Sequence, residues 1–188
     1  DATSVDLEKA AAADDGVTIV ELSRNFGHQA ALTAGLDLAT ADAVVTLDGD
    51  GQHPPELIGE MVTLFRAGYD VVLTQRIATD GSRFKRWTSA AFYRLLATIA
   101  DTPITAGSAD FRLLSRPVVD TLRQMREYHR FVRGMVAWTG YRTVVLPYTE
   151  GLRLGGASKY SLRGMARLAA DATFSFSLVP LRIALVVG

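Results

Sequence analysis

The sequence predicts an α/β fold with a mostly parallel sheet flanked by helices. Short β-branched runs alternate with longer stretches whose apolar residues recur at helical spacing. Each short run is nearly continuous in apolar residues, as expected for strands buried on both faces. Alternation of this kind is typical of βαβ units, in which ligands bind at the carboxyl ends of the strands. With 188 residues, of which 48% are hydrophobic, the chain is long enough for one sizeable core.

The first half of the chain carries the most regular pattern. Its elements are predicted in this order: strand 17–22, helix 29–39, strand 42–47, helix 56–66 and strand 69–74. Pro54 and Pro55 suit the first turn of the second helix, and Gly68 suits its end. These alternating elements are the ones that predict the parallel sheet.

The second half is less regular. Its expected elements are a basic loop 76–86, helix 87–100, a strand around 110–114, helices 117–125 and 128–138, strand 143–146, a Gly-rich loop 151–158 and a helix from Ser161. In that last helix Leu162, Met165 and Leu168 share one face, while Arg163 and Arg167 lie off it. Such a helix packs on a sheet or lies on an anionic membrane, and the pattern leaves both open.

Composition excludes several classes of protein. The absence of cysteine excludes disulfides, zinc thiolate sites and cysteine nucleophiles. Net charge is zero and no basic stripe is interleaved with aromatic residues, so a nucleic-acid partner is not expected. Residues 1–94 carry 8 basic and 14 acidic side chains, whereas residues 95–188 carry 12 and 6, and 17 of the 20 basic residues are Arg. This asymmetry suggests a cation site facing a phosphate site, although weak surface bias explains it equally well.

The segment from Asp48 to Gln52 follows a predicted buried strand. Two carboxylates two residues apart in an extended chain point to the same side, so Asp48 and Asp50 are expected to reach one divalent cation, with Gln52 repeating that direction. An EF-hand needs Gly at its sixth position and Glu at its twelfth, where this sequence has His53 and Gly59. The alternative is a polar turn without a ligand.

Four segments together resemble family 2 glycosyltransferases of the GT-A fold. They are LSRNFGHQAALTAG at 22–35, DGDGQHPPE at 48–56, ADFRLL at 109–114 and GASKY at 156–160. Their order and spacing resemble in particular the branch that makes polyprenyl-phosphate sugars, such as dolichyl-phosphate mannose synthases and bactoprenol glucosyltransferases. A dinucleotide-binding oxidoreductase is disfavoured, because no G-x-G-x-x-G segment follows any predicted strand.

The resemblance implies a role for each of several residues. Asp48, Asp50 and Gln52 would hold Mg²⁺ or Mn²⁺ against the diphosphate of a UDP- or GDP-sugar, and Asp110 would be the catalytic carboxylate that takes a proton from the acceptor or orients it. The donor would also be bound by Asp1, Arg153 and Lys159, and the phosphate of a polyprenyl acceptor by Arg76, Arg83, Arg86 and Ser89, with Lys85 beside them. A turn carboxylate is the alternative for Asp110, and solvated surface charge for the loop bases. Structural roles are expected for His28, His53 and His129.

The chain also departs from the family pattern, since the first strand of the fold, with its nucleobase-binding segment, is not found before Asp1. We expect a GT-A-like catalytic domain at 1–160 and amphipathic, juxtamembrane helices at 161–188, working at the cytoplasmic face of a bacterial inner membrane. The apolar run 181–188 is broken by Arg182 and is shorter than the roughly 20 residues that cross a bilayer. A homo-oligomer, a soluble transferase acting on a saccharide and a non-catalytic module that binds a nucleotide-sugar or a membrane surface all remain open.

Overall fold

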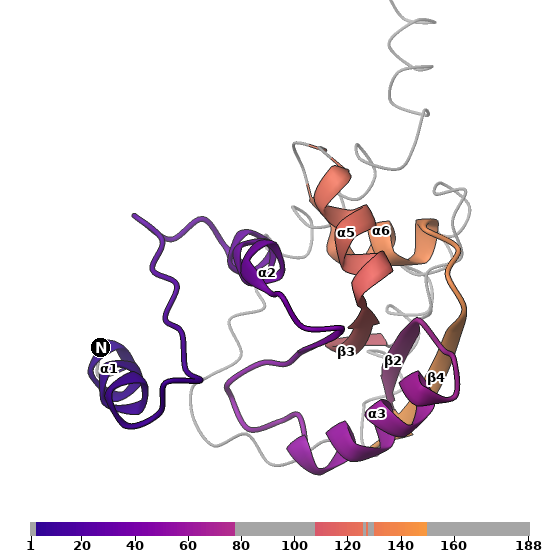
Figure 1. The fold of residues 1–188 in the computed structure, drawn as a ribbon, viewed down its shortest axis with the longest axis horizontal. Coiled ribbons are helices and arrows are strands. Elements are labelled where there is room, and N and C mark those ends of the chain that lie inside the picture. The colour runs from indigo at the N-terminus through magenta and orange to yellow at the C-terminus, as the bar shows by residue number, and fades with distance from the viewer. Residues whose placement is uncertain (1–2, 78–107, 126, 128–129, 150–188) are drawn as a thin grey trace, which may run out of the picture.

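The computed structural model describes residues 3–77, 108–125, 127 and 130–149. The elements of this part are α1 (Thr3–Ala13), α2 (His28–Leu38), β1 (Ala43–Thr46), the 3₁₀ turn η1 (Pro55–Leu57), α3 (Ile58–Arg66), β2 (Val71–Arg76), β3 (Ser108–Ser115), α5 (Arg116–Gln124), α6 (Val132–Trp138) and β4 (Thr143–Tyr148). Figure 1 shows the sheet with α3 on one face and α5 and α6 on the other. Helix α1 has no buried residue.

The four described strands form one sheet in the order β1-β3-β2-β4. Strands β1 and β2 both pair antiparallel with β3, and β4 pairs parallel with β2, so β1, β2 and β4 run in one direction. The predicted α/β fold is therefore confirmed, and the described sheet is mixed, because the central strand β3 runs antiparallel to the other three. As a result, the beginning of β3 lies at the same edge as the ends of the other strands.

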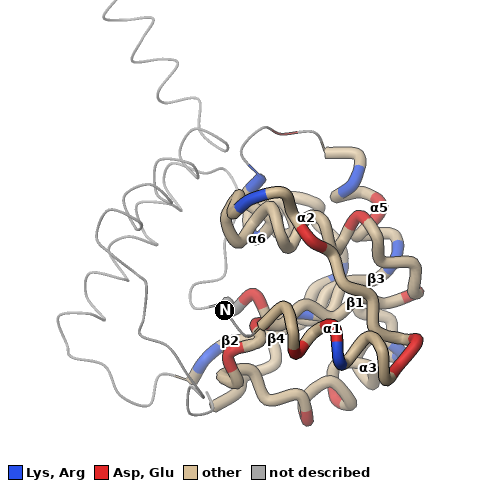
Figure 2. Tube along the Cα trace, turned by 90° about the vertical axis from the view of Figure 1, so that its left-hand side faces the viewer, with Lys and Arg blue, Asp and Glu red and all other residues tan. Residues whose placement is uncertain are grey.

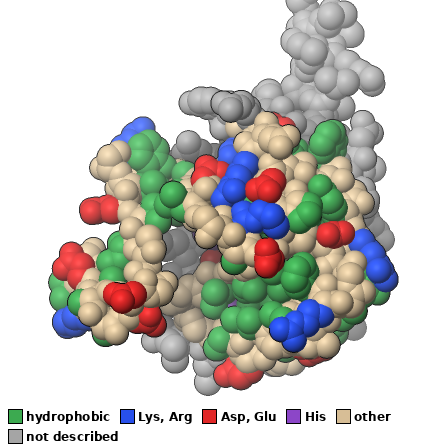
Figure 3. All heavy atoms as spheres, in the orientation of Figure 1, with side chains coloured by type: hydrophobic (Ala, Val, Ile, Leu, Met, Phe, Trp, Pro, Cys, Tyr) green, Lys and Arg blue, Asp and Glu red, His purple; other side chains and the backbone are tan. Residues whose placement is uncertain are grey.

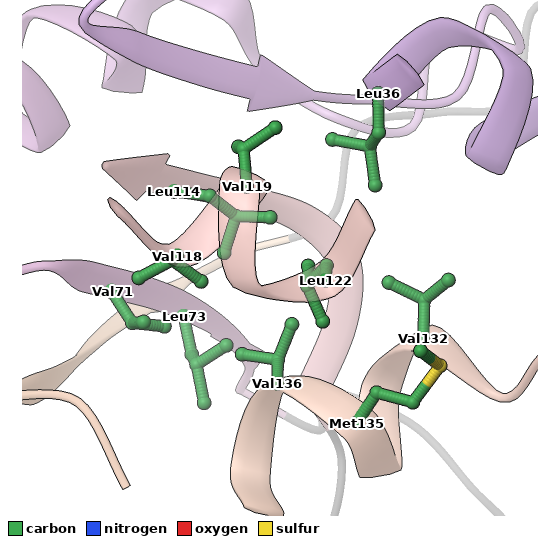
Figure 4. Close-up of a cluster of buried hydrophobic side chains, with 10 residues drawn as sticks. All are labelled: Leu36, Val71, Leu73, Leu114, Val118, Val119, Leu122, Val132, Met135 and Val136. Carbon is green, nitrogen blue, oxygen red and sulfur yellow. The ribbon is translucent and has the colours of Figure 1, made fainter. Parts of the chain in front are cut away.

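Two hydrophobic clusters pack against the two faces of the sheet. The first joins β2 and β3 to α2, α5 and α6 (Figure 4), and consists of Leu36, Val71, Leu73, Leu114, Val118, Val119, Leu122, Val132, Met135 and Val136. The second lies on the side of α3 and consists of Met61, Val72, Phe111, Leu113, Leu146 and Tyr148. Alternation along β3 sends Phe111 and Leu113 to the second cluster and Leu114 to the first, as the period of two in a strand requires.

Helices and strands predicted between 29 and 74 and between 108 and 148 are found close to their expected bounds, whereas the strand predicted at 17–22 is not found. The run 17–22 was expected to be a buried strand, but the structure gives it no strand, and Val17, Ile19 and Val20 are exposed. A strand needs a hydrogen-bonded neighbour, and none of the described strands pairs with this run. The predictions for loop 76–86 beyond Ile77, helix 87–100, loop 151–158 and the helix from Ser161 lie outside the described residues.

Arginines of α5 hold the end of α2 in place. The guanidinium of Arg123 donates to the carbonyl oxygens of Leu36, Asp37 and Ala39, and that of Arg116 donates to the carbonyl oxygens of Ala39 and Ala41. Helix ends leave unpaired carbonyl groups, which these donors satisfy. Figure 2 shows Lys and Arg interspersed with Asp and Glu along α5, and in Figure 3 blue and red side chains lie against one another in the middle of the face shown. The contacts fix α2 relative to β3, which matters for its first residue, His28.

Candidate active site

The polar residues predicted to be functional meet at one edge of the sheet. Asp48 follows the end of β1, Arg76 ends β2, and Asp110 lies near the beginning of the antiparallel β3. Thr46, the last residue of β1, donates its hydroxyl hydrogen bond to the carbonyl oxygen of Asp110 at 2.5 Å. The prediction that a ligand site forms at the carboxyl ends of the parallel strands thus agrees with where these side chains lie.

Three cationic or protonatable side chains surround the carboxylate of Asp110. Nε2–H of His28 donates to Oδ2 across 3.2 Å, and the guanidinium of Arg133 donates to the same oxygen across 3.0 Å. Arg112, on the same strand and completely buried, donates to Oδ1. The Asp110 side chain is only 13% exposed, so helix α2, helix α6 and strand β3 all converge on a nearly buried carboxylate.

These partners decide the protonation state of Asp110. Burial raises the pKa of the Asp110 carboxyl, but the hydrogen bond from His28 and the charges of Arg133 and Arg112 outweigh burial and hold that pKa well below its ordinary value. In return, the hydrogen bond to Asp110 raises the pKa of His28 against the opposing effect of desolvation. Burial lowers the pKa of Arg112 to about 10, so its guanidinium is still charged at neutral pH. Asp110 is a permanent anion at physiological pH.

Asp48, Asp50 and Gln52 lie on a turn after β1 and not on an extended chain. The strand ends at Thr46, and Gly51 takes a positive φ of 79°, a conformation that glycine adopts without strain. Oδ1 of Asp50 accepts a hydrogen bond from the backbone N–H of Gln52 at 3.1 Å, as in an Asx-turn. The expectation of two carboxylates aligned by extended geometry was therefore wrong, because the chain turns back after Asp48. The Asp48 side chain is 40% exposed at this turn.

His53 lies beneath this turn, and only 2% of it is exposed. Its ring stacks on Phe111 with centroids 5.2 Å apart and meets Tyr148 edge-on at 6.2 Å, while Phe111 and Tyr148 meet edge-on at 6.1 Å. Nδ1 of His53 accepts a hydrogen bond from the backbone N–H of Asp48 at 2.9 Å. Burial lowers the pKa of His53. We refer to His53, Phe111 and Tyr148 as the aromatic trio.

Arg76 contacts the same trio. Its Nε–H donates to the hydroxyl oxygen of Tyr148 at 3.3 Å, and the two residues are register partners in the parallel pairing of β2 with β4. Arg76 itself is exposed. The guanidinium is thus anchored on one side, which suits a group predicted to bind a phosphate.

The structure describes five of the predicted site residues and brings them to one edge: Asp48, Asp50, Gln52, Arg76 and Asp110. The other six lie outside the described residues: Asp1, Arg83, Arg86, Ser89, Arg153 and Lys159. Within the described ranges, no group of three or more His, Cys, Asp or Glu side chains is arranged to hold a metal ion. Among the helices of those same ranges, none has the length and apolar character to span a membrane.

Sequence reasoning did not give the contacts that four residues make with the predicted ones. His28 and His53 were expected to have structural roles, and His28 hydrogen-bonds to Asp110 while His53 hydrogen-bonds to the backbone of Asp48. Arg112 stands two residues from Asp110, and the period of two in a strand would have placed both on one face. Arg133 had no comparable signal, since its contact with Asp110 depends on how α6 packs. His129 lies outside the described residues.

Comparison with known proteins shows the family of the chain. The profile of the family described as "Glycosyl transferase family 2" matches residues 1–123. The chain belongs to this family. The resemblance seen in its four sequence segments is thereby confirmed at the level of the family, and the mixed sheet flanked by helices is consistent with the GT-A fold.

Curated relatives of this glycosyltransferase family 2 chain carry more specific names. It is 43% identical to the "Uncharacterized glycosyltransferase YkcC" of Bacillus subtilis over 93% of the chain and 54% of the relative. It is 38% identical to the "Prophage bactoprenol glucosyl transferase homolog" of Escherichia coli and to the "Bactoprenol glucosyl transferase" of Shigella phage SfV, over 100% of the chain and 62% of each relative. The chain therefore spans between about half and three fifths of the length of these relatives.

Proposed function

We propose that this protein transfers a sugar from a nucleoside-diphosphate sugar to a polyprenyl phosphate at a membrane face, with inversion at the anomeric carbon. The observation that carries the choice of acceptor is the 38% identity, over the whole chain, to proteins named bactoprenol glucosyl transferase. An oxygen of the acceptor phosphate forms a bond to the anomeric carbon, and the bond from that carbon to the donor diphosphate breaks. The products are the polyprenyl-phosphate sugar and the nucleoside diphosphate.

The turn after β1 supports a role in holding the donor through a divalent cation. Asp48 and Asp50 offer carboxylate oxygens and Gln52 offers an amide oxygen, and this hard donor set fits Mg²⁺ or Mn²⁺. Mg²⁺ commonly binds one or two protein carboxylates together with substrate phosphates and water. When bound, the cation supplies charge that stabilises the departing diphosphate.

Asp110 acts in this proposal by holding cations and not by taking up a proton. A phosphate monoester has its second pKa near 6, so a polyprenyl phosphate acceptor is mostly ionised at neutral pH and needs little help to lose a proton. The low pKa of Asp110 makes its carboxylate a poor base, whereas its contacts with His28 and Arg133 keep these two side chains at the edge where two phosphates must meet. Concentrated positive charge there favours binding of both substrates.

Arg76 is assigned to the acceptor phosphate. It stands at the end of β2, on the far side of β3 from the turn that would hold the donor, and it is exposed and anchored by Tyr148. Arg83, Arg86 and Ser89 follow it in the chain and are proposed to complete this phosphate site. Asp1, Arg153 and Lys159 are proposed to contact the donor.

A second candidate is a transferase of the same family that acts on a soluble saccharide. Such an enzyme would use the same donor chemistry but would need no basic site for an acceptor phosphate. Substitution of Arg76 therefore distinguishes the two candidate functions. The lipid-phosphate proposal requires Arg76→Ala to raise the KM for the acceptor without changing the KM for the donor. A saccharide transferase would be insensitive to this change.

The test is transfer of radiolabelled sugar from a panel of UDP- and GDP-sugars into organic-extractable polyprenyl phosphate. Membranes containing the full-length protein are assayed with Mg²⁺ and with EDTA, beside the variants Asp50→Asn and Asp110→Asn and the exposed control Asp37→Asn on α2. Because Asp110→Asn is also expected to destabilise the fold, activities are compared at equal amounts of folded protein. Label in the lipid phase that EDTA and both site variants abolish supports the proposal. Label found only in a water-soluble product would favour the saccharide transferase. Sugar transfer to lipid that persists in EDTA would contradict the proposed role of the cation.

A further inference from the structure

His53 is a buried side chain that accepts a hydrogen bond from the backbone of the turn proposed to hold the cation. The ring is enclosed on the side of α3, where it stacks on Phe111 and meets Tyr148 edge-on. A buried histidine on an aromatic stack is commonly a packing residue. This one also accepts a hydrogen bond from the backbone N–H of Asp48, and its other ring nitrogen faces the carboxylate of the same residue at 3.9 Å.

The contacts with Asp48 fix its backbone and approach its carboxylate. Nδ1 accepts the backbone N–H of Asp48 at 2.9 Å, so Nδ1 carries no proton in this contact, and in the neutral ring the proton resides on Nε2. Nε2 is buried, lies 3.9 Å from Oδ2 of Asp48 and has no hydrogen-bond partner among the described residues. The ring therefore spans Asp48 from its main chain to its carboxylate.

The aromatic trio also lies next to two other predicted site residues, Asp110 and Arg76. Phe111 follows Asp110 directly on β3, and Tyr148 accepts the hydrogen bond of Arg76. Thr74 donates its hydroxyl hydrogen bond to the carbonyl oxygen of Phe111 at 2.6 Å, which ties the centre of the trio to β2 as well. Asp48 and Arg76 are thus hydrogen-bonded to members of the aromatic trio, His53 and Tyr148. Asp110 directly precedes its third member in the sequence.

We propose that His53 is the positioning residue that presents Asp48 to the divalent cation, through its Nδ1 hydrogen bond to the Asp48 backbone and its seat on Phe111 and Tyr148. This inference rests on the proposed function, since it needs a cation at the turn. Without the acceptor nitrogen, the N–H of Asp48 loses its partner and the turn loses the contact that holds the start of the Asp-Gly-Asp segment against the sheet. A smaller residue that keeps an acceptor at the position of Nδ1 would lose the packing of the ring but could retain the hydrogen bond.

Two substitutions separate these two contributions. His53→Phe keeps an aromatic ring in the stack and removes the acceptor. His53→Asn removes the ring but keeps an acceptor, because Oδ1 of asparagine, like Nδ1 of histidine, is attached to Cγ. Met61→Ala, in the same hydrophobic cluster, serves as a control that weakens packing without touching the turn.

The purified full-length protein and each variant are titrated with Mn²⁺, alone and with UDP or GDP, and free Mn²⁺ is measured by electron paramagnetic resonance. The midpoint of thermal unfolding is measured for the same proteins. Loss of a side chain that orients a metal ligand typically lowers metal affinity about 10- to 100-fold, so we expect His53→Phe to weaken Mn²⁺ binding at least about ten-fold. Its unfolding midpoint should fall less than that of Met61→Ala, because the aromatic ring is kept. We expect His53→Asn and Met61→Ala to lower the midpoint while Mn²⁺ binding stays within about three-fold of wild type.

Three results would overturn the inference. Equal Mn²⁺ affinity in wild type and His53→Phe would leave the proposed function standing and reduce His53 to a packing residue. A loss of affinity that follows the unfolding midpoint across all three variants would do the same. Wild-type protein that binds no Mn²⁺ would remove the inference together with the proposed cation, whereas EDTA-insensitive transfer of sugar to lipid would still leave the assignment as a transferase.

Discussion

Nε2 of His28, the first residue of α2, lies 3.2 Å from Oδ2 of Asp110 near the beginning of β3, joining positions 82 residues apart in the chain. Asp110 also binds Arg112 and Arg133, so the carboxylate is held by one protonatable and two permanent cations. His28 is the only one of the three that changes charge near neutral pH. The link between α2 and β3 should therefore depend on pH.

The pH dependence of stability provides a first prediction. Because the folded pKa of His28 is raised, its ion pair contributes stability fully below the unfolded pKa of about 6.5 and loses it as pH rises through the folded pKa. The gain is less than about 1 kcal/mol, since the ring is 51% exposed. Urea unfolding of wild type and His28→Gln from pH 5.5 to 9 should show a stability difference that shrinks as pH rises. A difference that grows with pH would contradict the pairing.

Removing the charge of Asp110 should destabilise the protein strongly. Asp110→Asn leaves the buried guanidinium of Arg112 without its carboxylate, and breaking a buried pair costs about 3–5 kcal/mol. The matched control is Asp120→Asn, because Asp120 pairs with Arg116 and Arg123 but is 47% exposed, and such pairs contribute less than about 1 kcal/mol. Chemical denaturation measures both. Similar losses in the two variants would show that Arg112 finds another partner.

The anchoring of Arg76 predicts an effect on acceptor binding. Tyr148→Phe keeps the ring in the aromatic trio but removes the oxygen that accepts from Nε of Arg76. A typical hydrogen bond contributes about 0.5–1.5 kcal/mol, which corresponds to about a 2- to 12-fold rise in the KM for polyprenyl phosphate. We expect kcat and the KM for the sugar donor to stay close to wild type. Steady-state kinetics with each substrate varied in turn tests this, and a change confined to the donor would place Arg76 at the other substrate.

The hydrophobic cluster formed with α5 and α6 predicts which substitutions lower the free energy of unfolding. Leu122 is almost fully buried between these helices and the sheet, so Leu122→Ala should cost about 2–5 kcal/mol. Leu38, at the end of α2, is 59% exposed, and Leu38→Ala should change stability by less than about 0.5 kcal/mol. Denaturation midpoints of the two variants measure the contrast, and equal effects would mean that the cluster is not the core.

Sequence patterns predicted most of the fold because apolar runs and helical periodicity are local properties. Such patterns predicted a strand at 42–47 and a helix at 56–66, and the structure has them at Ala43–Thr46 and Ile58–Arg66. The run 17–22 has the composition of a strand but no neighbour to pair with among the described strands, and pairing is not local.

The candidate site was only partly predictable for the same reason. Asp48, Asp50 and Asp110 belong to recognisable segments, and the sequence placed them correctly near strand ends. Their contacts with His28, His53 and Arg133 depend on long-range packing and on the turn at Gly51, which local sequence does not specify. The location of these carboxylates was therefore predictable from the sequence, whereas the contacts that set the protonation state of Asp110 required the structure.

The central place of β3 has a consequence for synthesis on the ribosome. Both hydrogen-bonded neighbours of β2 in the described sheet, and the neighbour of β1, come later in the chain. At about 5–20 residues per second, residues 43–76 wait on the order of seconds before 108–115 have been made. During that interval two apolar strands present open edges to other nascent chains. Synonymous codon changes that slow translation of β3 should therefore lower soluble yield without altering the finished protein.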